Sequence, residues 1–216
     1  MTKIDSSFGE GVRPTTTERA VSVKLSTTHG EFLAIGYLDH RRGDEQMVLV
    51  YGDIEQDGVL TRLHSECLTG DVFDSKHCEC GSQLSAALDA IVKRGSGILI
   101  YLQGHEGRGI GLLAKLRAMK LQSEGMDTVE ANIALGLPVD SRDYSVAAEI
   151  LHDLGVRSVQ LLSNNPRKSE SLRSNGIGIE SLVPLLIPPS AENRFYQWTK
   201  RDRLNHHLPH LDVIED

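Results

Sequence analysis

Three cysteines, Cys67, Cys78 and Cys80, are the residues of this chain whose type and spacing most directly imply chemistry. Ten residues separate the first from the second, and Glu79 alone separates the second from the third. Zinc binds thiolates well in a tetrahedral shell, and a shell with three protein ligands leaves one position for water or substrate. His64 and His77 lie nearby in the sequence, so a closed structural site with a fourth protein ligand stays open as an alternative.

The competing interpretation is that the three cysteines are ordinary buried thiols, because free cysteine is among the most buried residue types. Buried thiols tend to sit in apolar runs, whereas these are surrounded by His, Glu, Asp, Lys, Gly and Ser. A Cys-x-Cys pair in a polar segment favours a metal, although the pattern is weaker than paired C-x-x-C motifs. The sequence therefore predicts a zinc site.

Several motifs around the cysteines resemble the GTP cyclohydrolase II family. They are HSECLTGD followed by C-x-C-G-x-Q, then EGRGIGL, DTVEAN, D-x-R-D-Y and the NNP of SNNPRK, in the family's order. The resemblance implies a zinc-dependent enzyme that opens the imidazole ring of GTP at C8, loses C8 as formate and releases pyrophosphate. The product would be 2,5-diamino-6-ribosylamino-4(3H)-pyrimidinone 5′-phosphate, for riboflavin biosynthesis. The resemblance further implies Mg²⁺ with the GTP phosphates.

The resemblance also assigns residues to the GTP site. These are Arg62, Leu63, His64, Ser65, Glu66, Gln83, Glu106, Gly107, Arg108, Thr128, Ser163 and Lys168. Arg62, His64 and Glu66 are spaced by two and would share one face of a strand, which from the residues alone indicates a solvated strand edge. Glycines before a helix let backbone N–H groups approach phosphate, but Gly104–Gly111 matches neither a Walker A loop nor a dinucleotide fingerprint.

Asp140 and Arg142 match the family residues proposed to act on the α-phosphorus, with Arg142 as nucleophile and Asp140 as its base. A guanidine is a poor nucleophile because its pKa exceeds about 12. Stabilisation of phosphate charge by Arg142 is therefore a competing role. Without the resemblance, the two residues would be interpreted as an ordinary surface ion pair.

Position 119 departs from the family pattern. The segment after EGRGIGL is close to K-x-R-A-Y in the family, and this chain has Met119 in place of the tyrosine. A phenol can donate a hydrogen bond and a thioether cannot. Losing one positioned acid–base group commonly costs about 10² to 10⁴ in rate. The sequence therefore predicts ring opening and pyrophosphate release with the formyl group retained, giving 2-amino-5-formylamino-6-ribosylamino-4(3H)-pyrimidinone 5′-phosphate. The alternative is that position 119 only packs.

Two alternatives to the formyl-retaining reaction remain. The complete reaction with formate release is the first, and a catalytically silent protein that binds zinc and nucleotide is the second. Retention of Cys67, Cys78, Cys80, Asp140 and Arg142 argues against a silent protein. A zinc-dependent nucleobase deaminase is discarded because its H-x-E and P-C-x-x-C elements are absent from the sequence.

The composition limits the partners. A net charge of −7 argues against a sequence-independent nucleic-acid binder, which needs a basic face, but a single nucleotide needs only a local basic pocket. No apolar run approaches the roughly 18 residues that span a membrane, and no secretory signal opens the chain. The odd number of cysteines fits a reducing compartment. We expect a cytoplasmic protein without membrane partners, and the family resemblance implies a homodimer.

The predicted fold is a mixed α/β (α+β) domain, with an N-terminal, largely antiparallel sheet followed by alternating helices and strands. Periodicity and turn residues predict strands at 20–25, 31–38, 47–51, 60–66, 97–102, 157–163 and 177–184, and helices at 83–94, 145–154, 167–174 and from the glycine run to about 123. Residues 127–143 are predicted as an active-site loop. The chain would divide into a mobile segment at 1–18, a catalytic domain at 19–187 and an irregular tail at 188–216.

Overall fold

The structure is a computed structural model that describes residues 16–212. In this part of the chain, one sheet has the strand order β1-β2-β3-β5-β4-β6-β7. Its strands are β1 (Thr17–Ser26), β2 (Glu31–Asp39), β3 (Asp44–Tyr51), β4 (Val59–Ser65), β5 (Gly97–Leu102), β6 (Ser158–Leu162) and β7 (Gly178–Val183). The helices are α1 (Leu68–Asp71), α2 (Cys80–Arg94), α3 (Leu112–Ser123), α4 (Thr128–Ala134), α5 (Ser145–Asp153), α6 (Pro166–Ser174) and α7 (Arg194–Leu204), with short 3₁₀ turns η1 (Glu106–Arg108) and η2 (Pro209–Leu211).

The sheet has an antiparallel half and a parallel half, which confirms the predicted mixed fold. β1, β2 and β3 pair antiparallel, and β3 continues antiparallel to β5. β4, β5, β6 and β7 then pair in parallel. Parallel strands direct their carboxyl ends to one edge of the sheet, where open α/β sheets bind ligands. The loops after β4, β5 and β6 therefore meet at that edge.

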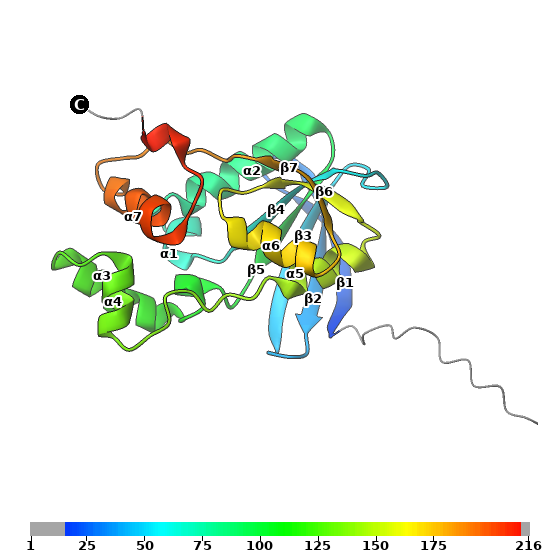
Figure 1. Ribbon diagram of the computed structural model, residues 1–216. Helices are drawn as coiled ribbons and strands as arrows, with labels where there is room; N and C mark the ends of the chain where they lie inside the picture. The colour runs from blue at the N-terminus through cyan, green and yellow to red at the C-terminus, as the bar shows by residue number, and fades with distance from the viewer. Residues whose placement is uncertain (1–15, 213–216) are drawn as a thin grey trace, which may run out of the picture.

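Two apolar clusters cover the two faces of the sheet. One combines strand residues with α5 and α6, and the other combines strand residues with α2, in agreement with the positions of these helices on opposite faces of the sheet (Figure 1). Strand β4 shows how the sequence divides between them: Leu63 belongs to the first cluster and Leu60 to the second. Because side chains alternate along a strand, Arg62 and His64 share the face of Leu60.

The positions of the predicted strands and helices agree with the structure to within a few residues, with two exceptions. Residues 127–143 were expected to be a loop but contain α4, because Asp127 and Glu130 form a capping box that starts a helix there. Residues 188–216 were expected to be irregular, which is wrong for 194–204, where α7 forms. The polar composition of that segment hides the helix, whose buried side includes Gln197 and Lys200.

The predicted mobile segment at 1–18 lies mostly outside the described residues, although Thr17 and Glu18 already belong to β1. Within residues 16–212, no helix combines the length and the hydropathy needed to cross a bilayer. Helices α3 and α4 lie beside each other away from the centre of the sheet, and α7 lies near α1 at the same end of the molecule (Figure 1). This end contains the cavity described next.

Candidate active site

A cavity opens at the carboxyl ends of β4, β5 and β6. Its walls come from the segments that follow these strands, from α3 and α4, and from α7. Sixteen residues predicted from the sequence line it: Arg62, His64, Ser65, Glu66, Cys67, Cys78, Cys80, Gln83, Glu106, Gly107, Arg108, Met119, Thr128, Arg142, Ser163 and Lys168. The fold thus brings together residues that lie up to about a hundred positions apart in the chain.

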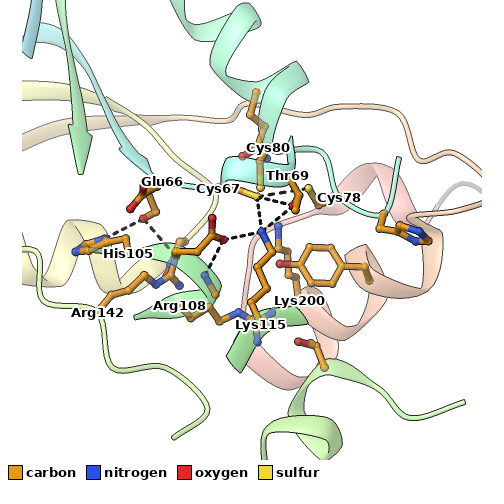
Figure 2. Close-up of a pocket in the computed structure, with 18 of the residues that line it drawn as sticks. Glu66, Cys67, Thr69, Cys78, Cys80, His105, Arg108, Lys115, Arg142 and Lys200 are labelled. Carbon is orange, nitrogen blue, oxygen red and sulfur yellow. Dashed lines mark hydrogen bonds and ion pairs between the residues drawn. The ribbon is translucent and has the colours of Figure 1, made fainter. Parts of the chain in front are cut away.

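The three cysteines converge at one end of this cavity (Figure 2). Their sulfur atoms all lie within 4.8 Å of one another, and Cys67 Sγ is 3.8 Å from Cys78 Sγ. Zinc–sulfur bonds of about 2.3 Å in a tetrahedral shell place two sulfur ligands about 3.8 Å apart. The spacing of the thiols therefore fits a zinc ion. Among residues 16–212, this is the cluster of His, Cys, Asp and Glu side chains close enough to hold a metal.

Gly70 shows how the local sequence makes room for the sulfur atoms. A Cβ atom at this position would lie 2.9 Å from Cys78 Sγ and 3.2 Å from Cys67 Sγ, closer than carbon and sulfur normally approach. Position 70 therefore has to be glycine for the thiols to converge. The turn is held further by Asp71, which accepts a hydrogen bond from the backbone N–H of Cys67 at 3.0 Å.

Lys115 of α3 links the sulfur atoms to the segment after β5. Its ammonium donates to Cys67 Sγ at 3.1 Å, to Thr69 Oγ1 at 2.8 Å and to Glu106 Oε1 at 2.6 Å (Figure 2). The other Glu106 oxygen accepts from the backbone N–H of Leu68 at 2.7 Å. Hydrogen bonds to its thiolate from Cys78 and Cys80, together with the charge of Lys115, lower the pKa of Cys67.

The glycine-rich run makes a tight turn that carries Arg108 into the cavity. Arg108 has φ of 65°, in the left-handed region that disfavours residues with a Cβ, and it is flanked by Gly107 and Gly109 at positive φ. Its guanidinium stacks over the Tyr196 ring at 5.7 Å. Within the described residues, both terminal nitrogens are buried without a hydrogen-bond partner, so this cation has unused donors.

Positive side chains outnumber negative ones in the lining of the cavity. Six lysines and arginines line it, against two carboxylates, Glu66 and Glu106. Lys168 is buried and donates to the backbone carbonyl of Leu63 at 2.7 Å. Burial and the neighbouring cations Arg62 and Arg142 lower the pKa of Lys168. A chain with a net charge of −7 therefore contains a local concentration of positive charge that an anionic ligand would stabilise.

Arg142 and Asp140 form a two-pronged ion pair at this end of the cavity. Arg142 Nε donates to one Asp140 oxygen at 2.9 Å and Nη2 donates to the other at 2.7 Å. Burial opposes the charge on Arg142, but the Tyr144 and Asp140 side chains raise its pKa above the ordinary value. Burial also opposes the charge on Asp140, and hydrogen bonds from Arg142 outweigh it and lower that pKa to about 2. Both groups are therefore charged at neutral pH.

A hydrogen-bond chain connects Arg142 to the segments after β4 and β5. Arg142 donates to Ser65 Oγ at 3.4 Å, and Ser65 is 3.2 Å from His105 Nδ1. His105 Nε2 donates to the Asp143 carbonyl at 3.0 Å, so Nδ1 is free to accept from Ser65. Burial, then the charges of Arg142 and Lys168, lower the pKa of His105 to about 3. His105 is consequently a neutral positioning group.

His64 is fixed from behind by Asp71. Its Nε2 lies 3.0 Å from each carboxylate oxygen of Asp71, and Tyr101 donates to the same carboxylate at 2.9 Å. Burial lowers the pKa of His64 although the Asp71 hydrogen bond opposes the shift. His64 therefore lines the cavity as a neutral ring. The trio Arg62, His64 and Glu66 is not a solvated strand edge, since β4 lies inside the sheet.

Two predicted residues reach the site only indirectly. The Leu63 side chain packs in the core on the opposite face of β4, and only its carbonyl contacts the site, through Lys168. Asp140 does not line the cavity and acts on it through Arg142. A sequence motif gives the identity and position of each residue. It does not show whether that residue contacts the site with its side chain, with its backbone or through a neighbour.

The sequence reasoning missed several residues of the cavity wall. Lys115 is one, although it begins the K-x-R-A segment that drew attention to Met119. His105 is another, adjacent to the EGR motif. Tyr196 and Lys200 come from α7 and His206 follows it. Tyr196 and Lys200 are four residues apart, which places them on one helical face, but a polar segment without apolar periodicity does not predict the helix that contains them.

Comparisons with known proteins agree with this site. The profile of the GTP cyclohydrolase II family matches residues 18–184. A GTP cyclohydrolase-2 of Streptomyces coelicolor is 67% identical over 199 residues, which cover 92% of this chain and 90% of that protein. The riboflavin biosynthesis protein RibBA of Mycobacterium tuberculosis is 52% identical over 204 residues. Those residues cover 92% of this chain and 48% of that protein, so the chain spans about half the length of this relative.

Among solved structures, the chain is similar to RibBX of A. baumannii, described as a two domain 3,4-dihydroxy-2-butanone 4-phosphate synthase. The TM-score is 0.47 and the identity 22%, with 78% of this chain and 40% of that chain covered. The family assignment depends instead on the profile match and on the Streptomyces relative. Together with a cavity that contains the family's motifs, these findings show that the chain belongs to the GTP cyclohydrolase II family and is a hydrolase of that type.

Proposed function

We propose that this enzyme opens the guanine imidazole ring of GTP at C8 and releases pyrophosphate. The observation that carries the proposal is a single cavity with a thiol triad at one end and an excess of positive side chains at the other. GTP has the matching division, with an electrophilic carbon in its base and several negative charges in its triphosphate. The base would approach Cys67, Cys78 and Cys80, and the phosphates would approach Arg108, Arg142 and Lys168.

Zinc is the cofactor that fits the triad, held by Cys67, Cys78 and Cys80. When bound, it would lower the pKa of a water molecule from about 15.7 toward 7 and so supply a nucleophile for C8. Lys115 offsets the charge of the three thiolates through its contact with Cys67. Glu106 holds Lys115 in place at 2.6 Å. The chain therefore contains a cation that compensates an otherwise negative metal centre.

At the phosphate end, the geometry favours charge stabilisation over nucleophilic attack by Arg142. A nucleophilic guanidine would have to lose a proton, whereas the pKa of Arg142 is raised and the pKa of Asp140 is lowered to about 2. Asp140 is then a poor base and a good orienting partner. We propose that Arg142 neutralises charge that develops on the α-phosphate. Mg²⁺ is proposed as the counterion of the GTP phosphates and would supply further charge neutralisation there.

We propose further that the complete reaction, with loss of formate, takes place in this cavity. The name of the Streptomyces relative, GTP cyclohydrolase-2, supports this outcome. The names of the RibBA relatives support a role in riboflavin biosynthesis. Met119 lines the cavity without a phenol, but Tyr196 of α7 lines the same cavity. Tyr196 would then provide the hydrogen-bonding group that position 119 lacks.

Retention of the formyl group is the second candidate, favoured by the half-buried thioether of Met119 on the cavity wall. Incubation of the zinc-loaded enzyme with GTP and Mg²⁺ would distinguish the two, because the formylated product is heavier by one carbonyl group. The complete reaction gives one formate per GTP, and Tyr196→Phe abolishes formate release but not ring opening. Formylated product from the wild type, with formate restored by Met119→Tyr, would establish the second candidate. No turnover above background would instead indicate a silent binding protein.

We also propose that the enzyme is a homodimer. Leu113 and Leu116 on α3 are 70% and 46% exposed, and Ile133 on α4 is 61% exposed. Several exposed large apolar side chains on neighbouring helices are typical of association surfaces. Light scattering of the purified protein would measure the mass directly, and a monomeric mass at micromolar concentration would contradict the dimer.

A further inference from the structure

Helix α7 contributes a buried lysine to the segment that carries two of the three thiols. Lys200 Nζ lies 2.6 Å from Glu79 Oε1, and Glu79 is the residue between Cys78 and Cys80. The side chains of Lys200 and Glu79 are 10% and 3% exposed. A buried charge that lacks a partner is strongly unfavourable, so each of these two side chains fixes the position of the other.

The position of Glu79 in the chain connects this ion pair to the thiols. Glu79 precedes the first residue of α2, Cys80, and its backbone carbonyl accepts from Gln83 at 2.9 Å. Its side chain contacts Lys200 of α7 and does not itself line the cavity, whereas Cys78 and Cys80 do. Holding this carboxylate therefore orients the thiols on both sides of it into the cavity.

Two further contacts fasten α7 to other walls of the same cavity. Arg203 pairs at 2.5 Å with Asp127, the capping residue of α4. The backbone N–H of His207, three residues after the end of α7, donates to the Asn164 carbonyl at 2.9 Å. The Lys200 ammonium also lies 4.4 Å from the centre of the Tyr196 ring on the same helix, and this contact restricts the conformation of the Lys200 side chain. Helix α7 is thus docked at three places, and Lys200 makes the contact nearest the sulfur atoms.

We propose that Lys200 is a positioning residue for the metal centre: through Glu79 it holds the Cys78–Cys80 turn in the geometry that binds the metal. The inference rests on the proposed zinc site. It adds that a helix more than a hundred residues away in the sequence influences the geometry of that site. Partners that orient metal ligands typically change metal affinity or activity by about 10- to 100-fold. A merely structural contact would change the stability of the fold without changing the geometry around the metal.

The test compares metal retention in matched variants of the full-length protein. Lys200→Met removes the ammonium and keeps the chain length, and Lys200→Met/Glu79→Gln removes both charges. Arg201→Met is the control, because the neighbouring Arg201 pairs with the exposed Asp202 and Asp212 outside the cavity. Zinc per chain and the rate of zinc transfer to a chromogenic chelator are measured without nucleotide. The visible spectrum of the Co²⁺-substituted protein then reports the coordination geometry.

We expect Lys200→Met to release zinc about 10 to 100 times faster than the wild type and to change the Co²⁺ spectrum. The double variant, which leaves no unpaired buried charge, should release zinc at an intermediate rate, and Arg201→Met at the wild-type rate. If Lys200→Met fails to fold, the double variant decides: release faster than that of both the wild type and Arg201→Met supports the inference.

Wild-type release rates and an unchanged Co²⁺ spectrum in a folded Lys200→Met or double variant would overturn the inference and leave the zinc site standing. Equal effects of Arg201→Met and Lys200→Met would also overturn it, because they would indicate a general loosening of α7. A wild-type protein that binds neither Zn²⁺ nor Co²⁺ at the three thiols would overturn the metal centre and, with it, the role of Lys200.

Discussion

The two ends of the cavity are built in different ways. The thiol end comes almost entirely from one short stretch, with Cys67 after β4 and Cys78 and Cys80 at the start of α2. The cationic end collects Arg62, Arg108, Arg142 and Lys168 from β4, η1, the segment before α5 and α6. A local site can be recognised by spacing alone, whereas a distributed site exists only once the sheet has brought its loops together.

The two ends also differ in how their charges are compensated. At the thiol end, Cys67, Lys115 and Glu106 form a chain of opposite charges. At the cationic end, Arg142 has a carboxylate partner, whereas Lys168 donates to a backbone carbonyl. The first end is prepared for a cation that the thiolates bind, and the second is prepared for an anion. Substitutions at the two ends should therefore have separable effects.

The largest separable effect is expected from Cys80→Ser. Loss of one of three thiolates should remove the zinc, and ring opening at C8 should fall to background because no activated water remains. Pyrophosphate release should persist, since its residues lie at the other end. Metal analysis and separate assays for the opened ring and pyrophosphate measure this. Full ring opening by a zinc-free variant would refute the division.

Arg142→Ala should give the converse result. Removing this guanidinium should slow pyrophosphate release by about 10² to 10³-fold, the usual consequence of deleting one charge-stabilising donor. The zinc content should stay at the wild-type value, because Arg142 contacts Ser65 and Asp140 and no cysteine. Arg157→Ala is the matched control, since Arg157 makes an exposed pair with Asp57. Near-normal pyrophosphate release would remove Arg142 from the mechanism.

The smallest effect concerns the pH dependence of stability at the cationic end. The pKa of His105 is about 3 in the folded protein and about 6.5 in an unfolded chain. Between these values the unfolded chain binds the extra proton, so the free energy of unfolding falls as the pH drops from 6.5 toward 3. The contribution is about 1.4 kcal/mol per pH unit.

Denaturant titrations of the wild type and His105→Gln across that range would measure the contribution. Glutamine retains a donor for the Asp143 carbonyl and cannot gain the proton, so the variant should show a shallower pH dependence. An identical slope in both proteins would mean that His105 is already accessible to protons in the folded state.

Much of the fold could be predicted from the sequence, because its strands and most helices are marked by regular apolar spacing and by glycine stops such as Gly95. Helix α4 was missed because a short helix with a strong cap, Asp127, resembles a polar loop. Helix α7 was missed because its buried side is made of Gln197, Thr199 and Lys200, polar residues that periodicity methods assign to the surface.

The residues of the candidate site also fall into a group that the sequence predicts and a group that it does not. The thiols, the EGR turn and Arg142 were all identified from motifs, which depend on nearby residues. Tyr196 and Lys200 could not be identified in this way, because their importance depends on where α7 docks. The backbone role of Leu63 could not be predicted either, because a motif does not show whether a residue contacts the site through its side chain or through its carbonyl.

The carboxylate of Asp127 has two simultaneous partners: one oxygen caps α4, and the other accepts from Arg203 of α7. Thr128, the first residue of α4, lines the cavity. A nucleotide that contacts Thr128 and favours the capped state of α4 therefore favours the docked state of α7 as well, and linkage makes the coupling free energy identical in both directions. Occupancy of the cavity would in this way be coupled to the docking of α7, and the apparent affinity for a nucleotide would include the free energy of docking that helix.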